Sequence, residues 1–392
     1  GLWGKTGDDL MVKNLHVQIN ITQSNNYTAG GIIGYALGDN MIIQNCRCTG
    51  IVRAKQIAGG IVGRIVCDSS AIIKYCCNLS EVKTSIKRTG TGGIVGHASG
   101  GVIRLTNCIN NGNIMASYST QASSAPADTT NSGGIIGVLY AGMVNLVGCV
   151  NTGNVASSYS FHSYETNYAV GIITYAFSGG LIGCANSGFS INKCFNTGII
   201  SANAHSSVDP NNTFQCTIKS YAYSGGIVGQ YQKGSNGIIC NSYNTGNVTR
   251  SCQTSGNSSG IFAYSSKPAT IRNCYNVGTC NVGVSTEAQS YVHDSYYLNT
   301  SSSGGAGTST SQSLMSSPSF PDILNTDSIV FAHNANFNQG YPILSNLMYL
   351  KTDTATNINF TQAKLNGIYA GSADVIGFQY KDNTNSNYTT VY

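Results

Sequence analysis

A five-residue unit that recurs along the chain constrains its fold more than any other feature of the sequence. The unit is Gly-Gly, two large apolar residues and a third Gly, and a second unit of the form Ile-x-Asn-Cys-apolar-Asn-Thr-Gly-x-Val follows it after a variable stretch. Copies of the first unit begin at Gly30, Gly59, Gly92, Gly133, Gly179 and Gly225. Units that cannot bury an apolar face alone bury it by stacking on their neighbours, so the repeat predicts a solenoid.

The residue types within the repeat favour strands over helices. Gly-Gly and β-branched residues both disfavour helix, and Asn-Thr-Gly supplies turn residues that accept positive φ. We therefore expect an all-β fold, a β-solenoid (parallel β-helix), over residues 1–300, right-handed because that hand dominates parallel crossovers. One coil would hold a strand at the Gly-Gly unit, a second around Asn-Cys and a short third at the closing Val or Ile. The insertions at 115–131, 156–169 and 201–223 would be loops at one corner.

The composition excludes several classes of protein. Charged residues make up 9 % of the chain, against about 25 % in an ordinary soluble domain. The 41 % hydrophobic residues and 24 Tyr argue against disorder. A formal charge of +5 is too weak to indicate a nucleic-acid or acidic-lipid partner, and no apolar run reaches the length of a membrane helix. We expect no nucleic-acid partner and no membrane span.

The 14 cysteines indicate an oxidising compartment. Six of them occupy the same place in the second unit and should stack in one column as small buried apolar residues: Cys46, Cys76, Cys108, Cys149, Cys194 and Cys274. The other eight are better disulfide candidates, with Cys48–Cys77 and Cys252–Cys280 as pairs between neighbouring coils. The spacings lack the Cys-x-x-Cys pairs and His partners of a zinc site, so we expect no metal.

Nine Asn-x-Ser/Thr triplets are candidate N-glycosylation sites. They are Asn20, Asn26, Asn78, Asn211, Asn247, Asn257, Asn299, Asn359 and Asn387. A chain rich in Asn, Ser and Thr also produces such triplets by chance. Because so few charges keep the surface hydrophilic, however, covalent N-glycans are the expected coat of an extracellular or cell-surface protein.

The paired units resemble the GLUG-motif repeats of secreted and surface-anchored adhesin-like proteins. Gly-Gly-Ile-Val-Gly followed by Asn-Cys-Tyr-Asn-Thr-Gly-x-Val carries the resemblance, which covers about residues 1–345 and includes the opening segment at 1–7. The resemblance implies a β-solenoid with a surface or matrix role and transfers no catalytic residue. The off-column cysteines and the insertions depart from the family pattern.

Two further segments follow the array. Residues 301–350 are expected to form a Ser/Gly-rich connector and the terminal cap of the repeats. Residues 351–392 resemble the opening strands of a fibronectin type III-like sandwich. They are fewer than half of the roughly 100 residues that a two-sheet sandwich requires.

Nothing in the sequence predicts an enzyme. Asp8-Asp9 is the only adjacent acidic pair, so no two carboxylates are placed to face each other across a cleft. Residues 256–260 match Gly-x-Ser-x-Gly but lack the strand-turn-helix context of a hydrolase. The basic cluster of Lys83, Lys87 and Arg88 is expected in a solvated loop. The six His show no ligand spacing: His16, His97, His162, His205, His293 and His333. We predict no catalytic residue and no cofactor.

The resulting expectation is an extracellular structural glycoprotein, the protomer of a head-to-tail fibre or surface appendage. The chain opens directly in a repeat at Gly1, so the first coil would present unpaired strand edges. Strand-like segments at 375–380 and 388–392 would pair with the next protomer in a contact that does not close. One alternative is that residues 1 and 392 are only the limits of a piece of a longer chain. Another is an adhesin, or a carbohydrate- or protein-binding module, that uses the insertions.

Overall fold

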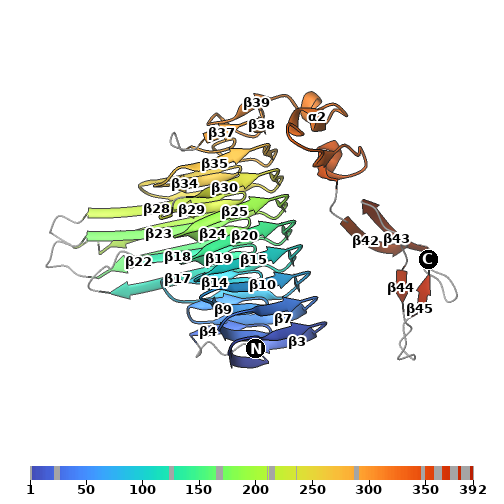
Figure 1. Cartoon of the computed structure of the whole chain (residues 1–392). Helices are drawn as coiled ribbons and strands as arrows, with labels where there is room; N and C mark the ends of the chain where they lie inside the picture. The colour runs from blue at the N-terminus through green and yellow to red at the C-terminus, as the bar shows by residue number, and fades with distance from the viewer. Residues whose placement is uncertain are drawn as a thin grey trace. The chain divides into compact units, whose positions relative to one another are not determined.

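Two compact units make up the chain, residues 1–312 and 313–392. The computed structural model describes residues 2–21, 27–122, 128–164, 171–209, 211, 217–234, 236–286, 291–345, 349–356, 364–370, 378–380 and 389–391. The first unit is a stack of coils whose strands pair in parallel with the coils before and after (Figure 1). The predicted all-β parallel solenoid is therefore confirmed.

Four parallel sheets, which we label A to D, run along the stack. Along the chain, a complete coil contributes a strand to sheet D, then to A, then to B and finally to C. Sheet A contains β1 (Trp3–Thr6), β5 (Ile33–Leu37), β9 (Val62–Val66), β14 (Val95–Ser99), β19 (Ile136–Leu139), β24 (Ile182–Ala185), β29 (Val228–Tyr231) and β34 (Phe262–Ser265). Sheet B contains β2 (Met11–Lys13), β6 (Met41–Gln44), β10 (Ser70–Lys74), β15 (Val102–Thr106), β20 (Met143–Val147), β25 (Gly188–Asn192), β30 (Gly237–Cys240), β35 (Ala269–Arg272) and β37 (Tyr291–His293).

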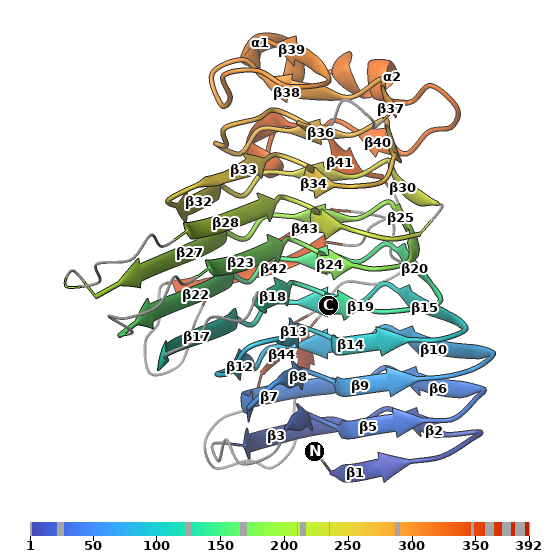
Figure 2. The same cartoon turned by 90° about the vertical axis from the view of Figure 1, so that its left-hand side faces the viewer.

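Sheet C holds both short and long strands. The short ones are β11 (Cys77–Asn78), β16 (Ile109–Asn110), β21 (Val150–Asn151), β26 (Phe195–Asn196), β31 (Tyr243–Asn244), β36 (Tyr275–Asn276), β38 (Tyr296–Leu298) and β39 (Thr308–Thr310). The others are β3 (His16–Ile21), β7 (Arg47–Ala54), β12 (Glu81–Thr84), β17 (Ile114–Ala122), β22 (Val155–Ser163), β27 (Ile200–Val208) and β32 (Val248–Cys252). Sheet D contains β4 (Thr28–Gly30), β8 (Ile57–Gly59), β13 (Gly90–Gly92), β18 (Asp128–Gly133), β23 (Gly171–Gly179), β28 (Thr217–Gly225) and β33 (Ser255–Ser259). Figure 2 shows these rows from the side.

The Gly-Gly unit is a corner and not the single strand that the sequence suggested. In the second repeat, β8 ends at Gly59, the chain turns through Gly60 and Ile61, and β9 begins at Val62. The turn brings backbone from neighbouring coils against Gly60: a Cβ there would lie 2.1 Å from the carbonyl oxygen of Gly93. A corner packed this closely excludes any side chain, which explains why Gly recurs at this place in the unit.

The insertions are strands in their described parts, contrary to the expected loops. β17, β22, β23, β27 and β28 each have nine residues and extend beyond the coil on one side, where Figure 1 shows them projecting. Strands of sheet C lie against strands of sheet D there. Two contacts between the sheets show this: Ser157 Oγ donates to the carbonyl oxygen of Phe177 at 2.7 Å, and the hydroxyls of Thr174 and Ser206 lie 2.9 Å apart. We call this two-layered extension the wing.

Aliphatic side chains from sheets A, B and C fill the interior of each coil. Ile32, Ile61, Ile94 and Ile135 of successive Gly-Gly units are fully buried, as is the Ile or Val that follows each of them. Since consecutive coils pair in register, identical residues lie above one another and the core is continuous along the stack. This continuity gives every coil the same packing partners as its neighbours.

The parallel stack extends to β39. This strand pairs with β38, so residues 308–310, within the segment expected to form the connector and terminal cap, add a strand to the end of the stack. The second unit contains α2 (Phe320–Leu324), the antiparallel pair β40 (Phe331–Ala332) and β41 (Ile343–Leu344), and the 3₁₀ turn η1 (Asn338–Gly340); α1 (Gln312–Met315) spans the boundary. Two antiparallel hairpins follow, β42 (Tyr349–Thr356) with β43 (Lys364–Ala370), and β44 (Phe378–Tyr380) with β45 (Thr389–Val391). The fibronectin type III-like start stays a prediction.

Replacing Gly60 by Ala tests the corner. The new Cβ would lie 2.1 Å from the Gly93 oxygen and 2.2 Å from Asn78 Cγ, so we expect destabilisation of about 1–3 kcal/mol or more, as in overpacked cores. The matched control is Gly4→Ala, where no described atom lies within 4 Å of the added methyl carbon. Urea unfolding followed by circular dichroism measures both. Equal midpoints for the two variants would contradict the packing of this corner.

Candidate functional site

A line of buried asparagine side chains runs along the stack and is its most regular polar feature. The six residues are the second Asn of the Asn-Cys-apolar-Asn unit, and each is completely buried: Asn78, Asn110, Asn151, Asn196, Asn244 and Asn276. From Asn78 to Asn244, each Nδ2 donates to Oδ1 of the Asn in the next coil, at 2.6 to 2.8 Å. We call this line the amide ladder.

Each ladder amide also closes the turn of its own coil. Asn110 Nδ2 donates to the carbonyl oxygen of Gly112 at 2.8 Å, and Asn151 Nδ2 does the same to Gly153. The two hydrogens of such an amide are thus used, one within the coil and one between coils. A buried donor without a partner costs about 1–3 kcal/mol of stability. Both bonds are therefore needed for this side chain to be buried in the core.

A left-handed residue turns the chain from sheet B to sheet C just before the predicted cysteine column. The φ angles at this corner lie between 44° and 64° in nine successive coils, and five of the residues are Asn: Asn14, Asn45, Asn107, Asn241 and Asn273. Asn adopts this backbone region more readily than most residues. The first Asn of the Asn-Cys unit therefore supplies the bend, and the second supplies the ladder.

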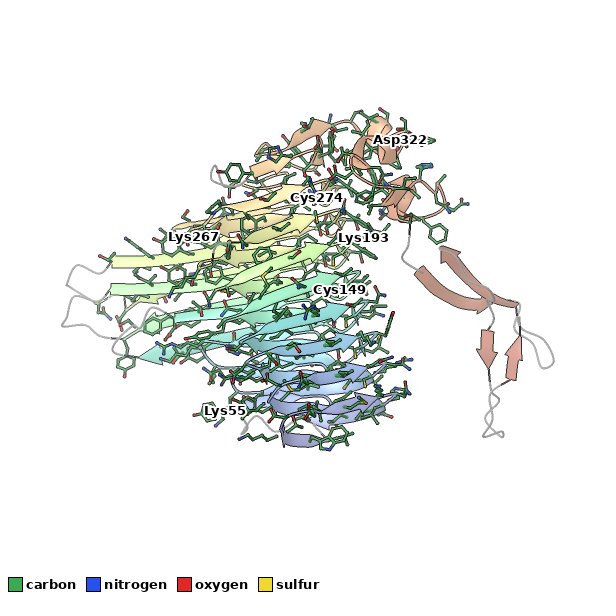
Figure 3. The ribbon with its side chains drawn as sticks, viewed as in Figure 1. Lys55, Cys149, Lys193, Lys267, Cys274 and Asp322 are labelled. Atoms are coloured by element: carbon green, nitrogen blue, oxygen red, sulfur yellow. The ribbon has the colours of Figure 1, made fainter. Side chains whose placement is uncertain are left out.

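The predicted cysteine column is present. Its six members are 0–1 % exposed, and Cys149 N–H donates to Cys194 Sγ at 3.2 Å. Ser242 and Ser295 take the same place in two coils, where their hydroxyls accept from Cys194 N–H and Cys274 N–H. Figure 3 labels Cys149 and Cys274 at different levels of the stack.

The predicted Cys48–Cys77 pair is wrong. Asn78, not Cys77, is in register with Cys48, so Cys77 lies beside Arg47 instead. Because side chains alternate between the two faces of a strand, Cys48 is buried inside while Cys77 lies on the other face. The described cysteines are all free thiols.

The predicted Cys252–Cys280 pair is wrong as well. Val248 N–H donates to the Thr279 oxygen, and this bond places the next residue, Cys280, beside Val248. The equivalent bond from Ile114 N–H to the Asn154 oxygen places Val155 beside Ile114 in the same way. Cys252 is four residues farther along the strand, about 13 Å away at 3.3 Å per residue. A disulfide needs Cα atoms within about 7 Å.

Four of the candidate glycosylation sites are exposed: Asn20, Asn211, Asn247 and Asn299. Asn257 is half-buried and its Nδ2 donates to Thr286 Oγ1 at 3.3 Å. Asn26, Asn359 and Asn387 lie outside the described residues. The exposed four can carry a glycan without any change in the core.

Asn78 is not compatible with a glycan in this fold. It is a member of the amide ladder, is 0 % exposed, and uses Nδ2 to donate to Ser80 and to Asn110. A sugar on that nitrogen would remove one of the two hydrogens and require space that the core lacks. The triplet at this position arises because Leu79 and Ser80 replace the usual Thr-Gly of the turn.

Neither the Gly-x-Ser-x-Gly match nor His97 lies in the surroundings of a catalytic group. Ser258 of the Gly-x-Ser-x-Gly match lies within β33, without the strand-turn-helix geometry of a nucleophile. His97 contacts the Tyr140 ring at 5.5 Å between centroids, and burial, with nearby Arg64, lowers its pKa to about 4. Within the described part of the chain, no group of three or more His, Cys, Asp and Glu could hold a metal ion.

Lys87 and Arg88 of the basic cluster lie in a bend with partly exposed side chains, as the sequence predicted, whereas Lys83 lies in β12. Lys87 Nζ lies 3.0 Å from Asp128 Oδ2, and Arg88 Nε donates to Asp128 Oδ1 at 2.6 Å. The Asp128 carboxylate is fully buried at the start of β18 in the wing. The cations therefore fix the wing to the preceding coil.

No helix in the described ranges is long and apolar enough to cross a membrane. Comparisons with protein-family models, with curated proteins and with solved structures found no match. The resemblance to GLUG-motif repeats accordingly stays a prediction from the residues.

Site-resolved glycan mapping tests the assignment of the exposed triplets. When the chain is secreted from a eukaryotic host, we expect glycans at Asn20, Asn211, Asn247 and Asn299, and none at Asn78. The measurements are glycopeptide mass spectrometry and intact mass before and after enzymatic removal of N-glycans. An unchanged mass would contradict the glycan coat, and a glycan at Asn78 in the folded protein would contradict the ladder.

Proposed function

We propose that this protein is an extracellular or cell-surface structural glycoprotein, and that its solenoid is the protomer of a head-to-tail fibre or surface appendage. The observation that carries the proposal is the amide ladder. It joins six consecutive coils through bonds that all point the same way along the stack. Side chains of this kind are buried and hold neighbouring coils together.

The polarity of the stack supports growth in one direction. Because strands of successive coils pair in parallel in all four sheets, the two ends of the stack present different strand edges. A second copy that continued the stack would use the same pairing, in a contact between two different surfaces. Contacts of this type need not close into a ring, so they propagate as a filament.

The surface composition supports an extracellular role. With 9 % charged residues, the chain has few ionic groups to keep a long body dispersed. Of the four exposed Asn-x-Ser/Thr sites, Asn20 lies in the first coil and Asn211, Asn247 and Asn299 lie in the later part of the stack. The proposal includes covalent N-glycans as a hydrophilic coat.

The alternative is an adhesin or a carbohydrate- or protein-binding module that uses the wing. Half-buried Tyr175 and Tyr221 are among the described aromatic residues of the wing that a ligand could contact. Their rings are nearly parallel, 13° apart with centroids 5.1 Å apart, so their faces contact each other. Sugars stack on ring faces, and a face already covered by a neighbouring ring stiffens the wing instead.

Electron microscopy of the purified full chain tests the assembly. We expect unbranched filaments whose length increases with protein concentration, because each end of a filament can add a further copy. Deglycosylated protein serves as the control for the contribution of the coat. Isolated short rods at every concentration would contradict the fibre, and ligand contacts concentrated on the wing would favour the adhesin.

A further inference from the structure

Five consecutive coils place a cysteine at the same corner. They are Cys46, Cys76, Cys108, Cys149 and Cys194, and the column then continues as Ser242, Cys274 and Ser295. The residue after each cysteine donates its N–H to the carbonyl oxygen of the column residue one coil earlier, at 2.8 to 3.2 Å for the bonds from Cys77, Ile109, Val150 and Phe195. These bonds set each cysteine directly beside the next.

We propose that neighbouring cysteines of this column form disulfides between coils when the chain folds in an oxidising environment. Paired parallel strands lie about 4.8 Å apart, within the range of about 4.4–6.8 Å that a disulfide allows between Cα atoms. The side chains lie close to the neighbouring coil as well: Cys194 Sγ accepts a hydrogen bond from Cys149 N–H at 3.2 Å. The structure, in which these residues are free thiols, is then the reduced form.

The chemistry needs a small-molecule disulfide as oxidant. One column thiolate attacks it, forms a mixed disulfide and releases one small thiol. The neighbouring thiolate then attacks the mixed disulfide, forms the bond between coils and releases the second small thiol. Two protein thiols become one disulfide, and their two electrons and two protons end on the two small thiols.

The reaction occurs while the coils close, because the finished column is 0–1 % exposed. In the organism it rests on the proposed extracellular role, which supplies the oxidant. The pairing itself depends only on the fold.

The column makes a prediction about numbers. Five thiols in a line can form two bonds between neighbours, which leaves one thiol free. Cys274 lies between Ser242 and Ser295 and has no cysteine neighbour in the column, so it stays reduced. Serine already occupies the column at Ser242 and Ser295. Cys→Ser substitutions at the other places of the column are therefore conservative.

In the experiment, the full chain is unfolded and reduced, and is then refolded in a mixture of reduced and oxidised glutathione. Free thiols are then alkylated, and disulfides are located by peptide mass spectrometry. We expect two bonds, both between consecutive column cysteines, and an alkylated Cys274. Cys76→Ser should leave one bond, because it isolates Cys46 and leaves three thiols in a line. Cys108→Ser should keep two, now Cys46–Cys76 and Cys149–Cys194.

Cys274→Ser is the matched control and should keep two bonds. Circular dichroism confirms that each variant folds, and the contrast between Cys76→Ser and Cys108→Ser is read from folded protein only. Fully alkylated column thiols in the folded wild type, equal bond numbers in these two variants, or bonds to Cys77 or Cys252 would overturn the proposal. Because the oxidant is supplied in the experiment, such a result would leave the glycan and filament tests of the proposed function unaffected.

Discussion

A buried amide that must bond in two directions is the constraint on which the solenoid depends. Asn78 donates within its own turn and to Asn110 in the next coil, and its Cγ would lie 2.2 Å from a Cβ at Gly60. The same relation joins Gly93 to Asn110. The Gly-Gly unit and the distant Asn-Cys unit therefore recur together because each amide needs a glycine beside it.

The ladder ends where its glycine meets a different side chain. In the coil before Asn78 the residue at the ladder place is Cys48, whose Sγ is 2.3 Å from the Cβ position of Gly31. After Asn276 the place is taken by Tyr297, whose ring covers Gly283. The glycine is kept in both coils, so close packing at the corner does not depend on the amide alone.

The sequence predicted the features that depend on one residue type repeating at one place. The strand class, the stacking and the cysteine column followed from the repeat and are present. The faces of individual residues did not follow: Cys48 and Cys77 are close in space but one register step apart, which reverses the side of the sheet. A spacing alone does not fix register. The same limit hid Asn78, since a glycosylation triplet and a ladder position look alike in sequence.

The wing shows a second limit. In residues 155–163 every second side chain is buried, the alternation typical of a strand. In the sequence, however, the low charge and the many Ser residues of this segment are also typical of a loop. What makes these segments strands is pairing with the corresponding segments of neighbouring coils, as between Tyr159 and Tyr118. Hydroxyl pairs such as Ser132 with Ser157, 2.7 Å apart, then satisfy the polar interior.

The most direct test of this account compares the stability of Asn151→Ala with that of Asn203→Ala. Asn151 is a buried ladder member. Its loss removes the donor to Asn196 Oδ1 and to the Gly153 oxygen, and the acceptor of Asn110 Nδ2. Asn203 is exposed on β27 in the same region. The account predicts a loss of about 2–4 kcal/mol for Asn151→Ala, from the buried groups that lose a bond to the amide, and a change within about 0.5 kcal/mol for Asn203→Ala. Equal urea midpoints for the two variants would contradict the claim that the amide ladder holds the coils together.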